Sequence, residues 1–231
     1  MIERVRVFGT STFVYRRFAV IDKRTVSAML LESADLLASE SDLLSEIDSK
    51  FGDGDHGITM LKIAKLIEQE VAAWDDESIG SFLDGLGCKA MEVRGGSAGP
   101  LYGTLISGLG FELSDDEDEL GPDAVKRMFS GCLSEMQDIT TAQVGDKTMM
   151  DALIPACEAA KAAADDIEAI LEAADDAAAG GARDSERYQS KFGRAKSYKE
   201  ETIGTPDAGA ISTSLFIRGL HEGYLKALQS H

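Results

Sequence analysis

Residues 47–60 read Ile-Asp-Ser-Lys-Phe-Gly-Asp-Gly-Asp-His-Gly-Ile-Thr-Met, and the rest of the chain is organised around this stretch. Three carboxylates, Asp48, Asp53 and Asp55, fall within eight residues, and glycines interrupt the second half. Because glycine readily adopts positive φ, such a loop can fold back and bring several side chains to one point. Helical apolar patterns precede and follow it, so the carboxylates lie between the end of one helix and the start of the next. Clustered hard oxygen ligands favour Mg²⁺ or Ca²⁺ over zinc.

Two simpler interpretations of this acidic stretch compete with a metal site. Asp-Gly pairs are ordinary turn signals and Asp is a common helix N-cap, so a solvated turn between two helices explains the loop equally well. An EF-hand would need acidic or amide residues at three alternating positions, followed by Gly and a later Glu. Counted from Asp53, the third of these positions is Gly57, which excludes an EF-hand.

Length and composition indicate an ordinary helical globular protein. A chain of 231 residues is long enough for one sizeable core or two small ones. Its 44% hydrophobic content is typical of globular proteins, and 4 prolines among many Ala, Leu and Glu residues favour helix. A formal net charge of −18 disfavours nucleic acid and anionic membrane surfaces as partners.

Cysteine usage and hydropathy indicate the cellular compartment in which the protein is expected. Cys88, Cys132 and Cys157 are odd in number and contain no close pair, which disfavours a disulfide framework or a zinc site and favours a reducing compartment. No apolar run approaches membrane length, and the N-terminus lacks the apolar segment of a secretory signal. We therefore expect a cytoplasmic protein that does not enter a membrane.

The first residues differ from the rest. Val5 and Val7 alternate with Arg4 and Arg6, which is typical of a short strand or an extended arm. Such an arm can pair with a partner or with a second copy in a homodimer, but a disordered extension or a misassigned start explains it as well. We expect an N-terminal extension over residues 1–22 and a single helical domain over residues 23–231.

From about Asp22 onward, apolar periodicity predicts eight helices. They cover approximately residues 22–37, 58–71, 79–91, 101–109, 122–139, 145–156, 165–179 and 208–228. Gly180-Gly181 predicts the end of the seventh helix, and the polar stretch 183–207 predicts a long functional loop. Mostly short connections predict an all-α fold, an eight-helix antiparallel bundle or barrel.

A second conspicuous stretch, residues 94–104, reads Arg-Gly-Gly-Ser-Ala-Gly-Pro-Leu-Tyr-Gly-Thr. Glycines just before a helix expose backbone N–H groups, and these together with the helix dipole favour an anion such as phosphate. A tight interhelical turn with small residues for close packing is the alternative. The stretch matches neither the Walker pattern nor the dinucleotide-binding fingerprint.

Two more stretches carry polar residues in unusual density. The first, residues 145–151, reads Gly-Asp-Lys-Thr-Met-Met-Asp, and here Asp146 or Thr148 can simply cap a helix. The second is the long loop, with Gly-Arg-Ala at 193–195 and a basic island in an acidic chain. The island consists of Arg183, Arg187, Lys191, Arg194, Lys196 and Lys199. A solvated loop is the ordinary explanation, but a basic lid beside a phosphate loop and an acid cluster would complete a phosphoryl-transfer site.

Taken together, these stretches resemble a known family. Asp-xxxx-Asp-Gly-Asp-His-Gly, Gly-Pro-Leu-Tyr-Gly-Thr, Gly-Asp-Lys-Thr-Met, and Gly-Arg-Ala followed by Asp-Ala-Gly-Ala occur in the order seen in the ADP-binding subunit of bacterial dihydroxyacetone kinases. The matching domain of single-chain dihydroxyacetone kinases has the same pattern. The resemblance covers residues 23–229, and it implies an eight-helix barrel with ADP or ATP and two Mg²⁺ ions at one end.

The resemblance also implies roles for particular residues. Asp48, Asp53 and Asp55 match the metal ligands and, with Arg194 on the phosphate side, the catalytic set. The residues matching nucleotide contacts are His56, Gly57, Ile58, Thr59, Gly95, Gly96, Ser97, Ala98, Gly99, Thr148, Met149, Arg194, Asp207, Ala208 and Gly209. Within that set, Ser97 and Ala98 match the phosphate-loop pair, and Met149 matches a residue of the adenine pocket.

The sequence departs from the family pattern at several of these positions. Ser97 and Ala98 stand in the reverse of the usual order, and Thr59 stands where Asn is common. Residues 207–209 read Asp-Ala-Gly where the family has Asp-Pro-Gly, and Thr140 lies near a position that is usually glycine. The departures leave open whether the acceptor is dihydroxyacetone or another short ketose or polyol.

The resemblance implies the phosphoryl-donor part of a kinase. In the family a His on a separate dihydroxyacetone-binding subunit holds the ketose; since no equivalent domain is evident here, we interpret His56 as a nucleotide contact. Either ADP stays bound and a phosphotransfer-system phosphoprotein rephosphorylates it, or ATP exchanges. A non-catalytic nucleotide-binding regulator that signals to a transcription factor is the alternative. The related fatty-acid kinases have Thr where His56 stands and match less well.

Overall fold

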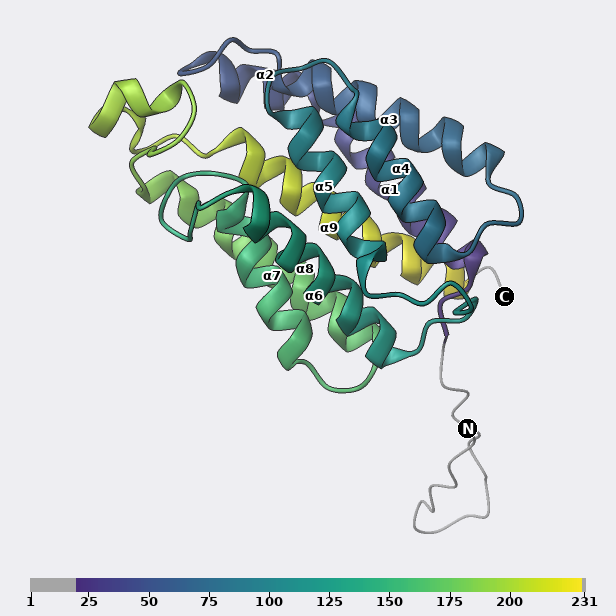
Figure 1. Ribbon diagram of the computed structural model, residues 1–231. Coiled ribbons are helices and arrows are strands. Elements are labelled where there is room, and N and C mark those ends of the chain that lie inside the picture. Colours follow the sequence, from purple (N-terminus) through teal and green to yellow (C-terminus); the bar gives the residue numbers. More distant parts are fainter. Residues whose placement is uncertain (1–19, 230–231) are drawn as a thin grey trace.

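The computed structural model describes residues 20–229, and this part of the chain is helical with no strand (Figure 1). The helices are α1 (Lys23–Ser39), α2 (Ser41–Ser49), α3 (His56–Ala73), α4 (Ile79–Met91), α5 (Ala98–Phe111), α6 (Pro122–Ile139), α7 (Met150–Ala162), α8 (Ile167–Asp184) and α9 (Ala208–Gln229). Two 3₁₀ helices, η1 (Ser185–Arg187) and η2 (Ala195–Thr202), lie between α8 and α9. The predicted all-α fold is confirmed.

Eight of the helices form a closed ring. Around it they follow the order α1, α9, α8, α7, α6, α5, α4 and α3, and α3 returns to α1 (Figure 1). Neighbours in the ring run antiparallel, so this is the up-and-down barrel that the sequence predicts. The short helix α2 is additional, and it packs at one end against α3 and α9.

The ring topology explains why four distant motifs can meet. Helices α3, α5, α7 and α9 all start at the same end of the barrel, and the loops that precede them carry the four motifs. Each of these helix N-termini directs N–H groups and a partial positive charge toward that end. We call this end the mouth of the barrel.

The predicted end of the seventh helix at Gly180-Gly181 is wrong, because α8 continues to Asp184. The reason lies in packing. A Cβ placed on Gly181 would lie 1.8 Å from the backbone oxygen of Asp151 on α7. Glycine is thus present because α8 crosses α7 too closely for any side chain, and it does not mark a helix stop.

The predicted arm over residues 1–22 falls almost entirely outside the described residues. The part that is described starts with an isolated antiparallel bridge, in which the backbones of Ile21 and Leu120 exchange hydrogen bonds of 2.9 and 2.8 Å. Asp22 then caps α1 by accepting a hydrogen bond from the Thr25 N–H. Within residues 20–229, no helix combines the length and apolar character needed to cross a membrane.

Candidate functional site

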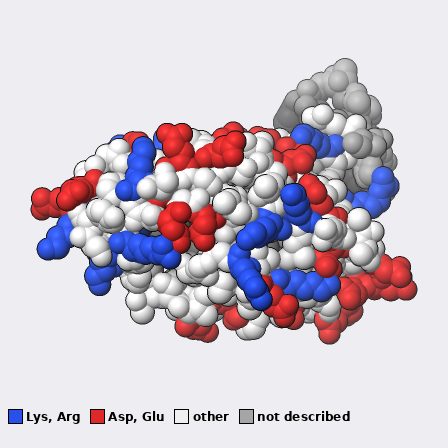
Figure 2. Space-filling model, turned by 90° about the horizontal axis from the view of Figure 1, so that it is seen from above, with Lys and Arg blue, Asp and Glu red and all other residues white. Residues whose placement is uncertain are grey.

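The mouth contains a cavity of about 470 Å³. Most of the residues predicted for the site line it: Asp48, Asp53, Asp55, His56, Gly95, Gly96, Ser97, Ala98, Thr148, Met149, Arg194, Asp207, Ala208 and Gly209. Residues from five separate segments therefore converge on one space. On the face shown in Figure 2, basic and acidic side chains are interspersed, so this face is not uniformly acidic despite the net charge of −18. An anionic ligand thus meets no single-signed acidic surface on that face.

Four predicted site residues do not line the cavity. Gly57 lies where a Cβ would be 1.8 Å from the Ser41 oxygen, and at Gly99 a Cβ would be 2.3 Å from the Val93 oxygen. Thr59 is buried against Gly95, whereas the Ile58 side chain is 54% exposed on the outside. Gly57, Thr59 and Gly99 therefore shape the loops that form the cavity. Thr59 in particular sets how closely α3 approaches the glycine loop.

The acid cluster is assembled by the turn between α2 and α3. Asp48 lies near the end of α2, and the chain turns through Gly54, which has φ of 74°. One carboxylate oxygen from each of Asp48, Asp53 and Asp55 lies within 4.8 Å of the others. Although Asp55 occupies the N-cap position of α3, its side chain makes no capping hydrogen bond. Its carboxylate therefore caps no helix, which disfavours a simple capped turn.

The electrostatics of this cluster fit a divalent cation. Burial raises the pKa of Asp55, and the neighbouring charges of Asp53 and Asp48 raise it further, while Arg194 lowers it. Such repulsion is relieved when a cation is held between the carboxylates. Three oxygen donors without sulfur or nitrogen are the ligand set that Mg²⁺ prefers. These residues therefore fit a bound Mg²⁺.

The glycine loop forms a second wall of the cavity. Gly96 has φ of 57°, a conformation that favours glycine, and Ser97 at the N-cap of α5 makes no side-chain capping bond. The Ser97 hydroxyl is therefore not used by a cap, and in the first turn of α5 the Gly99 N–H is left as a donor, since the Ala98 N–H donates to the Gly95 oxygen at 3.2 Å and Pro100 has no N–H. This is the arrangement in which a helix N-terminus binds an anion.

His56 is held at the start of α3. Its Nε2 lies 2.8 Å from the Ser212 hydroxyl, which itself donates to the Gly209 oxygen at 3.1 Å. Because a hydroxyl has one proton, Ser212 accepts the proton of His56 Nε2–H. Burial lowers the pKa of His56, although Asp48 and the Ala208 carbonyl oppose this effect. A neutral His56 therefore connects α3 to α9 beside the cavity.

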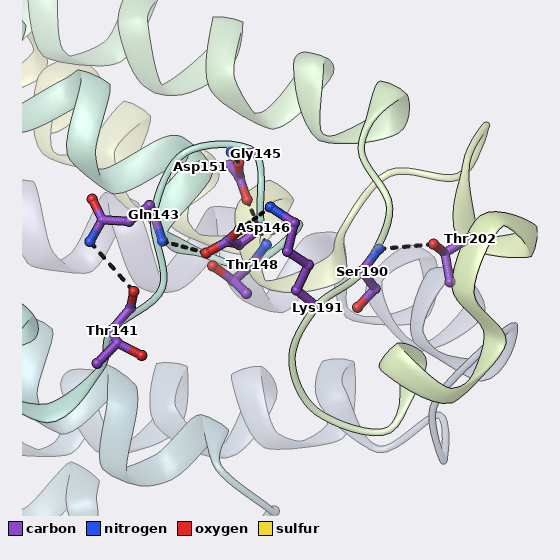
Figure 3. Close-up of polar contacts among 9 residues, drawn as sticks. All are labelled: Thr141, Gln143, Gly145, Asp146, Thr148, Asp151, Ser190, Lys191 and Thr202. Atoms are coloured by element: carbon purple, nitrogen blue, oxygen red, sulfur yellow. Dashed lines mark hydrogen bonds and ion pairs between the residues drawn. The ribbon is translucent and has the colours of Figure 1, made fainter.

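The loop of residues 145–149 folds around a buried carboxylate (Figure 3). Asp151 accepts hydrogen bonds from the Gly145 and Thr148 N–H groups, both at 2.6 Å. Of the two predicted caps for α7, Thr148 accepts from the Met150 N–H at 3.2 Å. Asp146 instead accepts from the Gln143 N–H at 2.8 Å and pairs with Lys191 at 2.5 Å. Asp146 therefore binds the long loop and caps no helix.

We call residues 185–207 the lid loop. Its Arg194 Nη1 lies 2.6 Å from Asp53 Oδ2, although the Arg194 side chain is 69% exposed. The ring of Tyr198 packs against Phe51 of the acidic loop, with centroids 5.2 Å apart. The basic island is thus only partly a solvated loop, because Arg194 and Lys191 both pair with acids of the mouth.

Asp207 stands at the far side of the cavity, where it caps α9 by accepting from the Ala210 N–H at 2.8 Å. Burial raises the pKa of Asp207 to about 7; the Ala210 N–H and Lys147 oppose this rise, and Asp151 and Asp48 add to it. The carboxyl group of Asp207 therefore titrates near neutral pH.

Sequence reasoning missed part of the lining. The apolar residues Ile47, Phe51, Leu101, Tyr102, Ala142 and Phe192 complete the cavity together with the predicted Met149. Lys147 also lines it, although its side chain is only 4% exposed. Ile47, Leu101 and Tyr102 follow the apolar periodicity of their helices, and Phe51, Ala142 and Phe192 stand in loops, so no local pattern marks either group as cavity lining. Lys147 had a signal, since it lies inside a stretch already singled out.

Comparisons with known proteins agree with the fold and the motifs. The chain is 31% identical over 216 residues to the ADP-binding subunit of PEP-dependent dihydroxyacetone kinase 2 from Listeria innocua, covering 90% of this chain and 98% of that one. It is 32% identical over 203 residues to the D-erythrulose kinase of Mycolicibacterium smegmatis, covering 84% of this chain but 34% of the kinase. The chain thus spans about a third of that relative's length.

A solved structure has the same architecture. The dihydroxyacetone kinase of C. freundii, in its native form, superimposes with a TM-score of 0.68 at 25% identity, covering 95% of this chain and 38% of that one. A model of the DAK2 domain matches residues 50–222, well over half of the chain. On these grounds, together with the near full-length match to the Listeria subunit, the chain belongs to the DAK2 domain family.

Proposed function

We propose that this chain is the nucleotide-binding, phosphoryl-donor component of a kinase for dihydroxyacetone or another short ketose. The observation that carries the proposal is the convergence of three aspartates, an uncapped glycine loop and Arg194 on one cavity. Phosphoryl transfer relies on positioning and on neutralising phosphate charge, and these groups supply both. The names of the relatives support the same activity.

The residues divide the work among them. Asp48, Asp53 and Asp55 would hold two Mg²⁺ ions, which would supply charge neutralisation at the phosphates. The N–H groups of the glycine loop and the start of α5 bind phosphate oxygens, and Ser97 adds a hydroxyl donor. Met149, Leu101 and Ala142 offer an apolar surface for the adenine. His56 and Asp207 to Gly209 complete the contacts.

Arg194 has a separate role at the entrance. Its guanidinium pairs with Asp53 while most of the side chain remains in water, so little holds it there. A planar guanidinium binds phosphate oxygens well. Arg194 therefore exchanges Asp53 for the transferring phosphoryl group and stabilises the charge that develops on it.

The acceptor hydroxyl comes from a partner. A second subunit or domain that binds dihydroxyacetone presents the hydroxyl at the mouth, and positioning it there supplies most of the rate. The name of the Listeria relative, a PEP-dependent ADP-binding subunit, favours a bound ADP that a phosphotransfer-system phosphoprotein rephosphorylates. The name of the Mycolicibacterium relative makes erythrulose a second sugar to test.

Native mass spectrometry and calorimetry test the binding half of this proposal. The purified protein should carry ADP with two divalent ions, or bind Mg-ADP when supplied. A hundredfold excess over Kd stabilises the fold by about 2.7 kcal/mol, so Mg-ADP should clearly raise Tm. ADP with EDTA should raise it far less. Equal shifts with and without Mg²⁺ would contradict a metal-bridged site.

A transfer assay tests the catalytic half. With Mg-ATP and dihydroxyacetone alone, the protein should form almost no sugar phosphate, and the cognate substrate-binding subunit should restore turnover. Rapid turnover without that subunit would reject the donor-subunit role. Strong nucleotide binding with no transfer under any of these conditions would instead favour the regulator.

A further inference from the structure

Lys147 combines three features that are rarely found in one residue. Its side chain is 4% exposed, its φ is 61°, and it lines the cavity. A left-handed backbone is unfavourable for a residue that carries a Cβ, so the surrounding structure must impose it. Buried lysines are usually paired, yet within residues 20–229 no carboxylate lies at ion-pair distance from its ammonium. Lys147 therefore calls for a specific explanation.

Asp151 explains the backbone conformation. The residue is 0% exposed, and its carboxylate accepts hydrogen bonds from the N–H groups of Gly145 and Thr148, which stand two residues before and one residue after Lys147. Two N–H groups on either side of Lys147, bound to one carboxylate, close the loop tightly. Lys147 thereby takes positive φ, and its side chain lies beneath the lid loop.

The ammonium of Lys147 bonds to both ends of the lid loop. Nζ donates to the Ser185 oxygen at 2.7 Å, and it also donates to the Thr205 oxygen. These two carbonyls are twenty residues apart in the chain and stand at the start and end of the lid loop. The Gly204 N–H also donates to the Glu186 oxygen at 2.7 Å, and this hydrogen bond likewise joins the two ends of the lid loop.

Arg194 lies at the tip of the lid loop, so its position depends on how the two ends of the loop are held. Gly193 and Gly204, with φ of 59° and 91°, give the loop freedom to move unless its ends are fixed. A second tether lies nearer the surface, where Lys191 pairs with Asp146 at 2.5 Å and its N–H donates to the Asp146 oxygen at 3.1 Å (Figure 3). Of the two lysine side chains, the buried Lys147 alone bonds to both ends.

We infer that Lys147 is a positioning residue, which anchors both ends of the lid loop to the floor of the cavity and thereby sets where Arg194 stands. The inference about Arg194 rests on the proposed function, whereas the anchoring does not. Lys147 acts through the lid loop and takes no part in the chemistry. Its positive charge is needed because two backbone carbonyls at one point require a strong double donor.

Limited trypsin digestion of the full chain without nucleotide tests the anchor. The bonds after Arg194, Lys196 and Lys199 all lie in the lid loop and report its opening. In Lys147→Met, cleavage at these bonds should rise about tenfold, while the barrel remains resistant. Lys147→Arg, which keeps two donors, should stay close to wild type. The matched control Lys191→Met removes the exposed tether and should raise cleavage less than about threefold.

Unchanged cleavage in a folded Lys147→Met protein would overturn the anchor. If that variant does not fold by circular dichroism, Lys147→Gln replaces it, because its single short amide cannot bridge both carbonyls; the same rise is then required. General loosening of the barrel, seen as cleavage outside the lid loop in step with that inside it, would also overturn the proposal.

A double-mutant cycle tests the link to Arg194, with Mg-ATP, dihydroxyacetone and the substrate-binding subunit. Lys147→Met should lower kcat about tenfold or more with little change in KM, yet cost little further rate in an Arg194→Ala background. Additive losses would reject action through Arg194. If wild type shows no transfer at all, the proposed function fails, whereas the digestion result still decides the anchor.

Discussion

The wall of the barrel and its mouth are built on opposite principles. The wall consists of regular helices packed through apolar and small residues. Within residues 20–229, every residue with positive φ lies in the loops of the mouth: Gly54, Gly96, Gly145, Lys147, Gly193, Lys199 and Gly204. Among the same described residues, the two charged residues that are buried are Lys147, in one of these loops, and Asp151, in the first turn of α7 directly after it.

This difference indicates how stability and function are divided. Helix packing in the wall stabilises the fold, whereas the strained backbone and clustered charges of the mouth destabilise it. Substitutions in the wall should therefore change the free energy of unfolding and leave ligand affinity alone. Substitutions in the mouth should change ligand binding or transfer, and those that remove a clustered or buried charge should raise the free energy of unfolding slightly. Four comparisons test this division, in order of decreasing effect.

The largest effect should come from the mouth. Arg194→Ala should lower the transfer rate by about a thousandfold in the presence of the substrate-binding subunit, as expected for an arginine that stabilises the transferring phosphoryl group. Since the exposed pair with Asp53 contributes at most about 1 kcal/mol, stability should barely change. Steady-state kinetics and urea unfolding give the two numbers. Arg187→Ala, an exposed arginine of the same loop, is the control, and an equal rate loss there would contradict the role.

The wall should respond in the opposite way. Gly219 on α9 faces α1 so closely that a Cβ would lie 2.2 Å from the Ser33 Cα. Gly219→Ala should cost about 3 kcal/mol of unfolding free energy while the folded fraction binds Mg-ADP normally. At Gly85 on α4 a Cβ would meet nothing within 4 Å, so Gly85→Ala should gain up to about 1 kcal/mol. A loss of Mg-ADP affinity in folded Gly219→Ala would contradict the division between wall and mouth.

Asp55→Asn should separate binding from stability. It removes one charged oxygen ligand at nearly constant size, so Mg-ADP affinity should fall at least about tenfold, or 1.4 kcal/mol, by calorimetry. Without ligand, the variant should gain about 0.5 kcal/mol or less through reduced repulsion. The control Asp76→Asn also removes one negative charge, in the loop between α3 and α4, and it should change neither Mg-ADP affinity nor stability. Wild-type affinity in Asp55→Asn would reject the metal site.

The smallest effect concerns pH. Asp207 has a folded pKa of about 7, above its unfolded value near 3.8, so the folded state holds its proton more tightly. Its contribution to stability is complete below pH 3.8 and is lost as pH rises to about 7. Asp207→Asn keeps the Ala210 hydrogen bond and cannot ionise. Relative to wild type it should gain stability between pH 4 and 8, by about 1 kcal/mol after allowing for partial exposure. A constant difference across that range would refute the shifted pKa.

Sequence patterns predicted the wall well because helix periodicity is local. The eight ring helices, the mouth loops and the acid cluster all follow from residues close together in the chain. The predicted end of α8 was wrong because a glycine can either stop a helix or permit two helices to cross closely. Which of these applies at Gly181 depends on the backbone of Asp151, thirty residues earlier. The packing roles of Gly57 and Gly99, and the anchoring by Lys147, depend likewise on distant backbone oxygens.

The pairing of α1 with α9 has a consequence for the chain as a polymer. The start of α1 and the end of α9 lie together at the end opposite the mouth (Figure 1), and Lys226 on α9 pairs with Glu32 on α1. A short peptide joining these two points would close the backbone into a circle without crossing the cavity. The acidic loop after Ser114 could then be cut to make new ends. The ring is thus defined by its cyclic order of helices, and the position of the chain ends is incidental to it.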